Sequence, residues 1–291
     1  MCRHLAYLGA PRPLAGLLLD PPHGLYEQSY APRRQRHGTV NADGFGIGWY
    51  PEPPPEAEAN GGPEPARYRR AVPVWSDPNL SDLARVLRSG CVLAAVRDAT
   101  PGTAYDEAAV APYRAGPWLF SHNGAVSDWQ LLPRDAGLGL SAEELLRLEA
   151  RCDAAVLWAA VHARLAAGEP PGAALSAVVR QVAAVRPQAR LNLLLTDGRS
   201  IHATRWGDTL WYRYDAYGLI VASEPDSATG PAAREGAQEW LEVPECSLLT
   251  ADRASVRTEP LAQPVQAAAQ PSPAAPPSGV RLATTERTPA P

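Results

Sequence analysis

The sequence contains no lysine, so all 27 side chains in its lysine-plus-arginine count are arginine. Without a lysine the chain cannot form a Schiff base with a carbonyl substrate or with pyridoxal phosphate. It also lacks the phosphate-binding lysine of a P-loop. These three kinds of site are therefore excluded.

Strong charge and long apolar runs are also missing. The formal net charge of −4 is too small to indicate a nucleic-acid surface, and no basic run with interleaved aromatic residues occurs. The apolar run Leu17-Leu18-Leu19 ends at Asp20 and is too short to cross a bilayer. The N-terminus lacks the basic head and apolar stretch of a signal peptide. We therefore expect no nucleic acid and no membrane as partners, and a cytoplasmic location.

Cysteine is scarce, with four residues at positions 2, 91, 152 and 246 and no Cys-x-x-Cys pair. This spacing argues against a closely spaced metal site, and disulfides are rare in cytosolic proteins. Cys91 opens an apolar run and Cys246 precedes Ser-Leu-Leu, so both are predicted to be buried strand residues. We expect no metal and no organic cofactor.

Strand-like and helix-like patterns alternate in blocks along the chain. Helical spacing of apolar residues and a capping box at Ser141 and Glu144 indicate a helical middle section. The order β-rich, α, β-rich predicts an α+β fold in which two sheets pack between helix layers. The predicted strands are 2–9, 44–50, 67–75, 91–99, 118–126, 190–196, 200–205, 209–214, 218–223, 247–249 and 255–257, and the predicted helices are 77–89, 143–167 with a break around 151–153, and 173–185.

Two segments have the composition of irregular structure. Residues 51–65 are rich in Pro, Glu and Gly and are predicted to form a solvated loop between strands. Residues 263–291 are rich in Pro, Ala, Ser and Thr and are predicted to be a disordered tail. One domain over 2–262 is therefore expected.

The second residue, Cys2, has the chemistry of a nucleophile. Removal of Met1 would leave a free α-amine on Cys2, with an ordinary pKa of about 8. The thiol has an ordinary pKa of about 8.5. The residue would then carry its own base. From this feature alone, a cysteine that stands second by chance is the favoured interpretation.

Three later segments offer partners for such a nucleophile. Asn123 and Gly124 end an apolar strand and offer two donors for an oxyanion hole, although Asn-Gly is also a common hairpin turn. Arg97 follows a buried strand and suits a carboxylate, although a structural ion pair explains it equally well. Asp153 suits an ammonium group or, alternatively, a helix cap.

Taken together, these segments resemble the class II glutamine amidotransferase family, which are N-terminal-nucleophile hydrolases with a mature N-terminal cysteine. The family's fold is a four-layer αββα sandwich, and Pro101 stands where the family has a histidine. The matching elements, in the family's order, are Met1-Cys2-Arg3-His4, residues 41–49, residues 95–100, Ser121-His122-Asn123-Gly124, Cys152-Asp153 and residues 221–225.

The resemblance implies a role for each matching residue. Cys2 is expected to be the nucleophile with its own α-amine as base, and Asn123 and Gly124 the oxyanion hole. The substrate-binding residues are expected to be Arg97 and Thr100 at the glutamyl α-carboxylate, Asp153 at the α-ammonium, and His122.

The opening segment 1–9, residues 41–49 and residues 74–80 resemble the stand-alone branch, in particular the γ-glutamyl-hercynylcysteine sulfoxide hydrolases of ergothioneine biosynthesis. We expect no synthase domain behind 2–262, so the resemblance implies hydrolysis of a small-molecule γ-glutamyl amide. Two alternatives stay open: a glutaminase subunit that supplies ammonia to a separate synthase, and an inactive γ-glutamyl-binding module. The sequence is compatible with a homo-oligomer and does not determine the oligomeric state.

Overall fold

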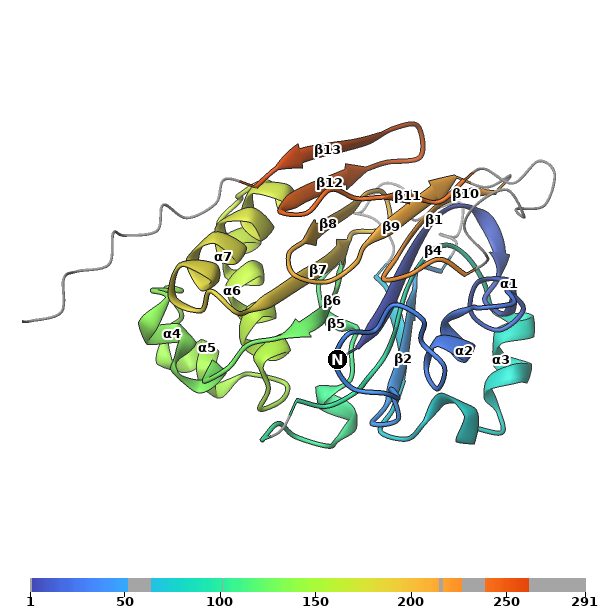
Figure 1. Ribbon diagram of the computed structural model, residues 1–291, viewed down its shortest axis with the longest axis horizontal. Coiled ribbons are helices and arrows are strands. Elements are labelled where there is room, and N and C mark those ends of the chain that lie inside the picture. The colour runs from blue at the N-terminus through green and yellow to red at the C-terminus, as the bar shows by residue number, and fades with distance from the viewer. Residues whose placement is uncertain (1, 52–63, 101, 215–216, 227–238, 262–291) are drawn as a thin grey trace, which may run out of the picture.

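The computed structural model describes residues 2–51, 64–100, 102–214, 217–226 and 239–261. Within them, a seven-stranded and a six-stranded antiparallel sheet pack face to face, with helices on both outer faces (Figure 1). The described chain begins at one edge of the sandwich, between the two sheets. The predicted α+β sandwich of four layers is confirmed.

The strand that follows Cys2 is central in its sheet and pairs with a neighbour on each side. In spatial order, the seven-stranded sheet contains β11 (Leu241–Glu242), β9 (Trp211–Tyr214), β10 (Gly218–Ala222), β1 (Arg3–Pro13), β4 (Arg88–Val96), β2 (Phe45–Trp49) and β3 (Ala66–Arg70). The six-stranded sheet contains β13 (Val256–Pro260), β12 (Ser247–Ala251), β8 (Ile201–Arg205), β7 (Arg190–Thr196), β6 (Trp118–Ala125) and β5 (Tyr113–Ala115).

Helices form the two outer layers. The long helices α6 (Asp153–Ala166) and α7 (Pro171–Val185) cover the six-stranded sheet (Figure 1). The short helices α1 (Ala15–Leu18), α2 (Leu25–Gln28) and α3 (Leu80–Val86) cover the seven-stranded sheet. The remaining helical segments are α4 (Leu132–Asp135), α5 (Ala142–Leu146) and the 3₁₀ turns η2 (Val74–Ser76), η3 (Glu107–Ala109) and η4 (Trp129–Leu131). Among the described residues, no helix is both long and apolar enough to cross a membrane.

Alternation along β1 decides which layer each side chain enters. Tyr7 belongs to the apolar core beneath α1–α3, whereas Leu8 belongs to the core between the two sheets. Because successive strand side chains point to opposite faces, Cys2 and His4 face the space between the sheets. Arg3 points to the outer face of the seven-stranded sheet.

Most of the predicted strands and the second long helix are confirmed. The predicted strand 190–196 matches β7, and the predicted helix 173–185 starts two residues earlier as α7. The capping box at Ser141 is present, since its hydroxyl accepts from Glu144 N–H at 3.1 Å. The predicted helix 143–167 is divided into α5 and α6, because Cys152 has an extended backbone that ends any continuity between them.

Several predictions required correction. The predicted strand 67–75 stops at Arg70, because the chain turns into η2 after Pro73. The predicted helix 77–89 is reduced to α3, because the carboxylate of Asp77 accepts Asn79 N–H in a turn and the last residues already belong to β4. Cys91 is buried as expected, but Cys246 is half-buried before β12, with a left-handed φ of 54°. Residues 52–63 of the predicted loop and the predicted tail 263–291 lie outside the described residues.

A buried carboxylate joins β1 to the segments around it. Glu224, just after β10, accepts backbone N–H groups of Arg33 at 3.0 Å and Arg34 at 2.9 Å. It also forms a hydrogen bond with the His23 ring and lies 3.7 Å from the Arg3 guanidinium. Burial by itself raises the pKa of Glu224, but these hydrogen bonds and the Arg3 charge hold that pKa below its usual value. The carboxylate therefore stays ionised inside the fold.

We expect Glu224→Gln to lower the free energy of unfolding by about 3 kcal/mol, because it removes the negative charge that faces the buried Arg3 guanidinium. Since folding lowers the pKa of Glu224, its contribution is complete above the unfolded pKa of about 4.3. It is lost as pH falls through the folded pKa. Urea unfolding of both proteins at neutral and acidic pH should show the difference between them shrinking in acid.

The matched control is Glu242→Gln. Glu242 is partly exposed and pairs with Arg205 at 2.8 Å, so the expected loss is below about 1 kcal/mol. Equal losses in the two variants would contradict a special role for the buried carboxylate.

Candidate active site

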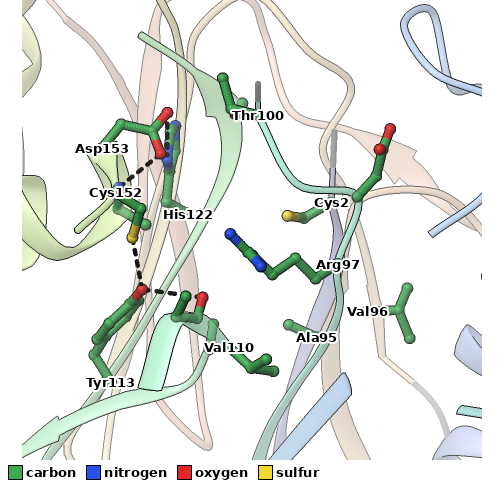
Figure 2. Close-up of a pocket in the computed structure, with 15 residues that line it drawn as sticks. Cys2, Ala95, Val96, Arg97, Thr100, Val110, Tyr113, His122, Cys152 and Asp153 are labelled. Carbon is green, nitrogen blue, oxygen red and sulfur yellow. Dashed lines mark hydrogen bonds and ion pairs between the residues drawn. The ribbon is translucent and has the colours of Figure 1, made fainter. Parts of the chain in front are cut away.

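A pocket opens at the edge of the sandwich where β1 begins. Cys2 directly precedes β1 and is half-buried, and Figure 2 shows its sulfur pointing into this pocket. The ends of β4 and β6 and the start of α6 supply the other walls. Of the predicted site residues, the pocket is lined by Cys2, Arg97, Thr100, His122, Gly124 and Asp153.

Arg97 directly follows β4 and is only 7% exposed. Its Nη2 donates to Thr103 Oγ1 at 3.0 Å and to the Ala104 carbonyl at 2.8 Å. Its Nη1 is buried and has no hydrogen-bond partner among the described residues. The guanidinium points into the space between Cys2 and His122 (Figure 2). Since leaving a buried charged donor unpaired is costly, Nη1 is well placed for an anionic ligand, and the alternative of a structural ion pair gains no support from the described part of the chain.

Thr100 lines the same side of the pocket as Arg97. Its carbonyl accepts both the N–H of Thr103 at 3.1 Å and the Thr103 hydroxyl at 2.7 Å. This turn places Thr103 where it receives the Arg97 guanidinium. Thr100 therefore contributes to the orientation of Arg97 as well as to the wall.

Asp153 opens α6 and is 5% exposed. Its Oδ1 accepts Ala154 N–H at 2.9 Å, and its Oδ2 accepts Val126 N–H at 3.0 Å. The carboxylate thus binds an amide of the first helical turn and ties α6 to the end of β6. Each carboxylate oxygen keeps acceptor capacity, so this anchoring leaves Asp153 able to bind a cation in the pocket.

The tautomer of neutral His122 follows from its neighbours. Nε2 lies 2.9 Å from the Arg190 carbonyl, which can only accept, so Nε2 carries the proton. Nδ1 lies 4.0 Å from Asp153 Oδ2 and makes no direct hydrogen bond with it. A neutral His122 therefore presents a ring acceptor beside the carboxylate, an arrangement that suits an ammonium group.

The N–H of Gly124 points toward the pocket side of β6. Its register partner, Leu191, donates its own N–H to Trp206, away from β6. In an antiparallel pair of this kind, the N–H groups of both residues point away from the partner strand. The N–H of Gly124 therefore makes no hydrogen bond with β7. Val126, two residues further along the same edge, donates to Asp153. The strand therefore directs this row of amides at the pocket.

Close packing explains why residue 124 is a glycine. An added Cβ would lie 1.9 Å from the Arg190 carbonyl oxygen and 2.7 Å from His122 Nε2. A side chain here would displace both the backbone of β7 and the histidine ring.

Asn123 is placed on the other face of β6, and it is the one predicted site residue that does not line the pocket. It is fully buried between the sheets, like Leu119 on the same face of the strand. Its Nδ2 donates to Ser223 Oγ at 3.1 Å, while its Oδ1 is buried without a partner among the described residues. The alternative interpretation of Asn123-Gly124 as a hairpin turn is wrong, because β6 continues to Ala125.

The thiol of Cys2 lies in a mixed electrostatic environment. Burial raises the pKa of the Cys2 thiol, whereas the amino-terminal charge, Arg97 and the backbone N–H of Asp98 act to lower it. The net pKa is raised, so the resting sulfur is protonated near neutral pH. Attack on an electrophile therefore requires a base within reach.

Sequence reasoning did not place Cys152 in this pocket. Its sulfur lies 3.1 Å from the Tyr113 hydroxyl, which also donates to the Ala109 carbonyl at 3.2 Å (Figure 2). Both side chains are buried and line the pocket. The position of Cys152 directly before Asp153 is the one sequence signal that points to it.

The chemistry of the pocket is that of a zwitterion receptor with a nucleophile. Arg97 offers a cation and Asp153 an anion, and both lie close enough to Cys2 to influence the pKa of its thiol. A small molecule with a carboxylate, an ammonium group and an electrophilic carbon would match these features.

Comparison with known proteins gives consistent results. Residues 26–220 match the family model of class II glutamine amidotransferases. A protein from Mycolicibacterium smegmatis named gamma-glutamyl-hercynylcysteine sulfoxide hydrolase is 41% identical, over 90% of this chain and 100% of its own. A protein of the same name from Mycobacterium tuberculosis (strain CDC 1551 / Oshkosh) is 42% identical, over 86% of this chain and 92% of its own.

Solved structures share the fold at low sequence identity. A glutamine aminotransferase class-II domain protein from Silicibacter pomeroyi superposes with a TM-score of 0.61 at 24% identity, covering 90% of this chain and 100% of its own. The glutamine phosphoribosylpyrophosphate amidotransferase of B. subtilis superposes with a TM-score of 0.57 at 13% identity, covering 90% of this chain and 49% of its own. These likenesses support the arrangement of the layers.

The electrostatics of Cys2 predict how its sulfur is alkylated. We expect the rate of iodoacetamide modification to rise with pH around a midpoint above that of an unburied thiol. Arg97→Gln should move the midpoint higher and slow the reaction at fixed pH, because it removes a charge that lowers the thiol pKa. Mass spectrometry of the Cys2 peptide measures the rate. Arg85→Gln, at an exposed position on α3, is the control, and identical profiles for the two variants would contradict the assignment.

Proposed function

The chain belongs to the class II glutamine amidotransferase family, and on that premise we propose that it hydrolyses the γ-glutamyl amide of γ-glutamyl-hercynylcysteine sulfoxide in ergothioneine biosynthesis. The products are glutamate and hercynylcysteine sulfoxide. The observation that carries the proposal is the buried Nη1 of Arg97, which has no hydrogen-bond partner in the described part of the chain and lies in the pocket shared by the Cys2 thiol and the Asp153 carboxylate. The curated relatives of that name, which match most of the chain, support the choice of leaving group.

A free γ-glutamyl group matches the charges of the pocket. Its α-carboxylate pairs with Arg97, with Thr100 nearby. Its α-ammonium is received by the Asp153 carboxylate and by Nδ1 of neutral His122. With both ends of the amino acid held, the side chain extends toward Cys2 and presents its γ-carbonyl carbon, which is the proximity that acyl transfer requires.

The first chemical step forms a thioester. After removal of Met1, the α-amine of Cys2 takes the thiol proton and the sulfur attacks the γ-carbonyl carbon. Gly124 N–H and the Asn123 amide donate to the resulting oxyanion. When the intermediate collapses, the C–N bond breaks and the α-ammonium returns the proton to the leaving amine.

The second step releases glutamate. Water attacks the γ-glutamyl thioester while the α-amine accepts a water proton. The C–S bond then breaks, the free carboxylate of glutamate forms and the Cys2 sulfur recovers its proton. The raised pKa of the Cys2 thiol fits this scheme, because a protonated resting thiol needs the adjacent amine as its base.

The proposal also covers location, assembly and the extent of the domain. We propose a cytoplasmic location for the enzyme. A homo-oligomer is compatible with the fold. Residues 2–262 are proposed as the catalytic domain.

Substrate comparison tests the proposed reaction. We expect kcat/KM for glutamate release to be about 100-fold higher with γ-glutamyl-hercynylcysteine sulfoxide than with glutamine, because one side of the pocket should bind the leaving group. Cys2→Ala should lower kcat by about 10⁴-fold or more while the substrate still binds. Enzyme-coupled detection of glutamate measures both.

Each alternative function gives a different result in this experiment. Comparable rates on glutamine would favour a glutaminase subunit. Full activity of Cys2→Ala, or of a protein shown by mass spectrometry to retain Met1, would overturn the mechanism. Binding without turnover in the unmodified protein would indicate an inactive γ-glutamyl-binding module.

Recognition of the α-carboxylate by Arg97 predicts a specific loss. We expect Arg97→Gln to raise KM by about 10- to 100-fold, the equivalent of one charge-assisted hydrogen-bonded contact. A substrate whose α-carboxylate is converted to an amide should bind both proteins about equally, because its contact with Arg97 is already weakened. Arg114→Gln on β5 is the matched arginine control. An equal loss with both substrates would show that Arg97 acts through the fold.

A further inference from the structure

Ser223 stands directly after β10 and is fully buried between the sheets. Its Oγ accepts the backbone N–H of His4 at 3.0 Å and lies 3.1 Å from the side-chain amide of Asn123. It also lies 3.3 Å from the His4 carbonyl, which already accepts Ser223 N–H at 2.9 Å. One hydroxyl therefore connects the strand that begins behind Cys2 with the proposed oxyanion-hole residue.

The single hydroxyl proton has two destinations. In the first arrangement, the hydroxyl proton makes a long hydrogen bond to the His4 carbonyl, which already accepts the N–H of Ser223. Asn123 then points Nδ2 at Ser223 and leaves Oδ1 buried without a donor among the described residues. Directed at Asn123, the same proton bonds Oδ1, and Nδ2 takes the unpaired position. Because the two ends of an amide have the same shape, the hydrogen-bond network determines its orientation.

Only the second arrangement provides a donor. Each leaves one amide atom of Asn123 without a partner among the described residues, which is unfavourable for a buried polar group. An unpaired Oδ1 would repel a developing oxyanion, whereas an unpaired Nδ2 would stabilise it. The free N–H of Gly124 is contributed by the next residue, so the two donors are adjacent along β6.

We propose that Ser223 is a positioning residue for catalysis: its hydroxyl donates to Asn123 Oδ1 and so directs Nδ2 at the oxyanion. This inference rests on the proposed function. Ser223 does not touch the substrate and acts only through the orientation of Asn123. This role fits the chemistry of a serine hydroxyl, which has one proton to donate and lone pairs that accept. The Ser223 hydroxyl accepts a hydrogen bond from the backbone N–H of His4 and donates its own proton to the amide of Asn123.

The test is a double-mutant cycle in kcat. We expect Ser223→Ala to lower kcat by about 10- to 100-fold, somewhat less than the loss of an oxyanion donor itself, with KM changed less than about threefold. In an Asn123→Ala background, the same change should lower kcat by less than about threefold, because the amide that Ser223 orients is absent. Rates are measured by release of glutamate from γ-glutamyl-hercynylcysteine sulfoxide, well below the melting temperature of each variant.

The matched control is Ser121→Ala. Ser121 is also fully buried between the sheets and also contacts His4, with its Oγ 2.7 Å from Nδ1, but its hydroxyl makes no hydrogen bond with the Asn123 side chain in the described structure. We expect Ser121→Ala to leave kcat within about threefold of the unmodified enzyme. If Ser121→Ala lowers kcat as much as Ser223→Ala does, the effect comes from disturbing the buried layer around His4 and not from the orientation of Asn123. That result would overturn the proposal.

A second variant covers the case in which Ser223→Ala does not fold. Ser223→Cys keeps the size of the side chain and replaces the hydroxyl with a weak donor, so its loss of kcat should also disappear in the Asn123→Ala background. Additive losses in either cycle would overturn the proposal. A different result, full activity of Cys2→Ala, would contradict the proposed function itself.

Discussion

The pairing of β1 with β4 on one side and β10 on the other is the constraint on which the site depends. The register sets Arg3 opposite Val96 and Leu5 opposite Ala222. Cys2 is thereby placed beside Arg97, which comes just after Val96, and Ser223 comes beside His4. The first residues of a chain are often poorly ordered. Here β1 lies at the centre of a seven-stranded sheet, and its pairing on both sides fixes the position of Cys2.

The second constraint is the burial of polar groups at the seam between the sheets. His4, Ser121, Asn123 and Ser223 are fully or almost fully buried, and hydrogen bonds link them into one layer behind the pocket. Burial of this kind is costly unless partners are supplied. Among the described residues, His4 Nε2, Asn123 Oδ1 and Arg97 Nη1 remain buried without a hydrogen-bond partner. Those of Arg97 and Asn123 are informative, because the proposed reaction gives each of them a ligand.

The pocket contains two opposite charges that are kept apart, the cation of Arg97 and the anion of Asp153. Arg97 and Asp153 do not pair with each other in the described structure, although both lie near Cys2. Asp153 is held by backbone amides, and Arg97 by neutral oxygens, so neither charge is cancelled. In the reaction that we propose, a zwitterionic head group neutralises both charges at once, and its recognition is a condition for presenting the γ-carbonyl to the sulfur.

The sequence by itself determined the layered α+β class, most of the strands, the capping box at Ser141 and six of the residues that line the pocket, because periodicity, local capping and short motifs are properties of the local sequence. It did not determine where the helix before β4 begins and ends, the turn conformation of Cys246 or the place of Cys152. These depend on competition between neighbouring elements. The tertiary structure decided between the strand and the hairpin turn that the sequence left open at Asn123 and Gly124, because β6 continues to Ala125. Only it revealed that Ser223, remote along the chain, contacts that amide, because such contacts follow from sheet register and carry no local signal.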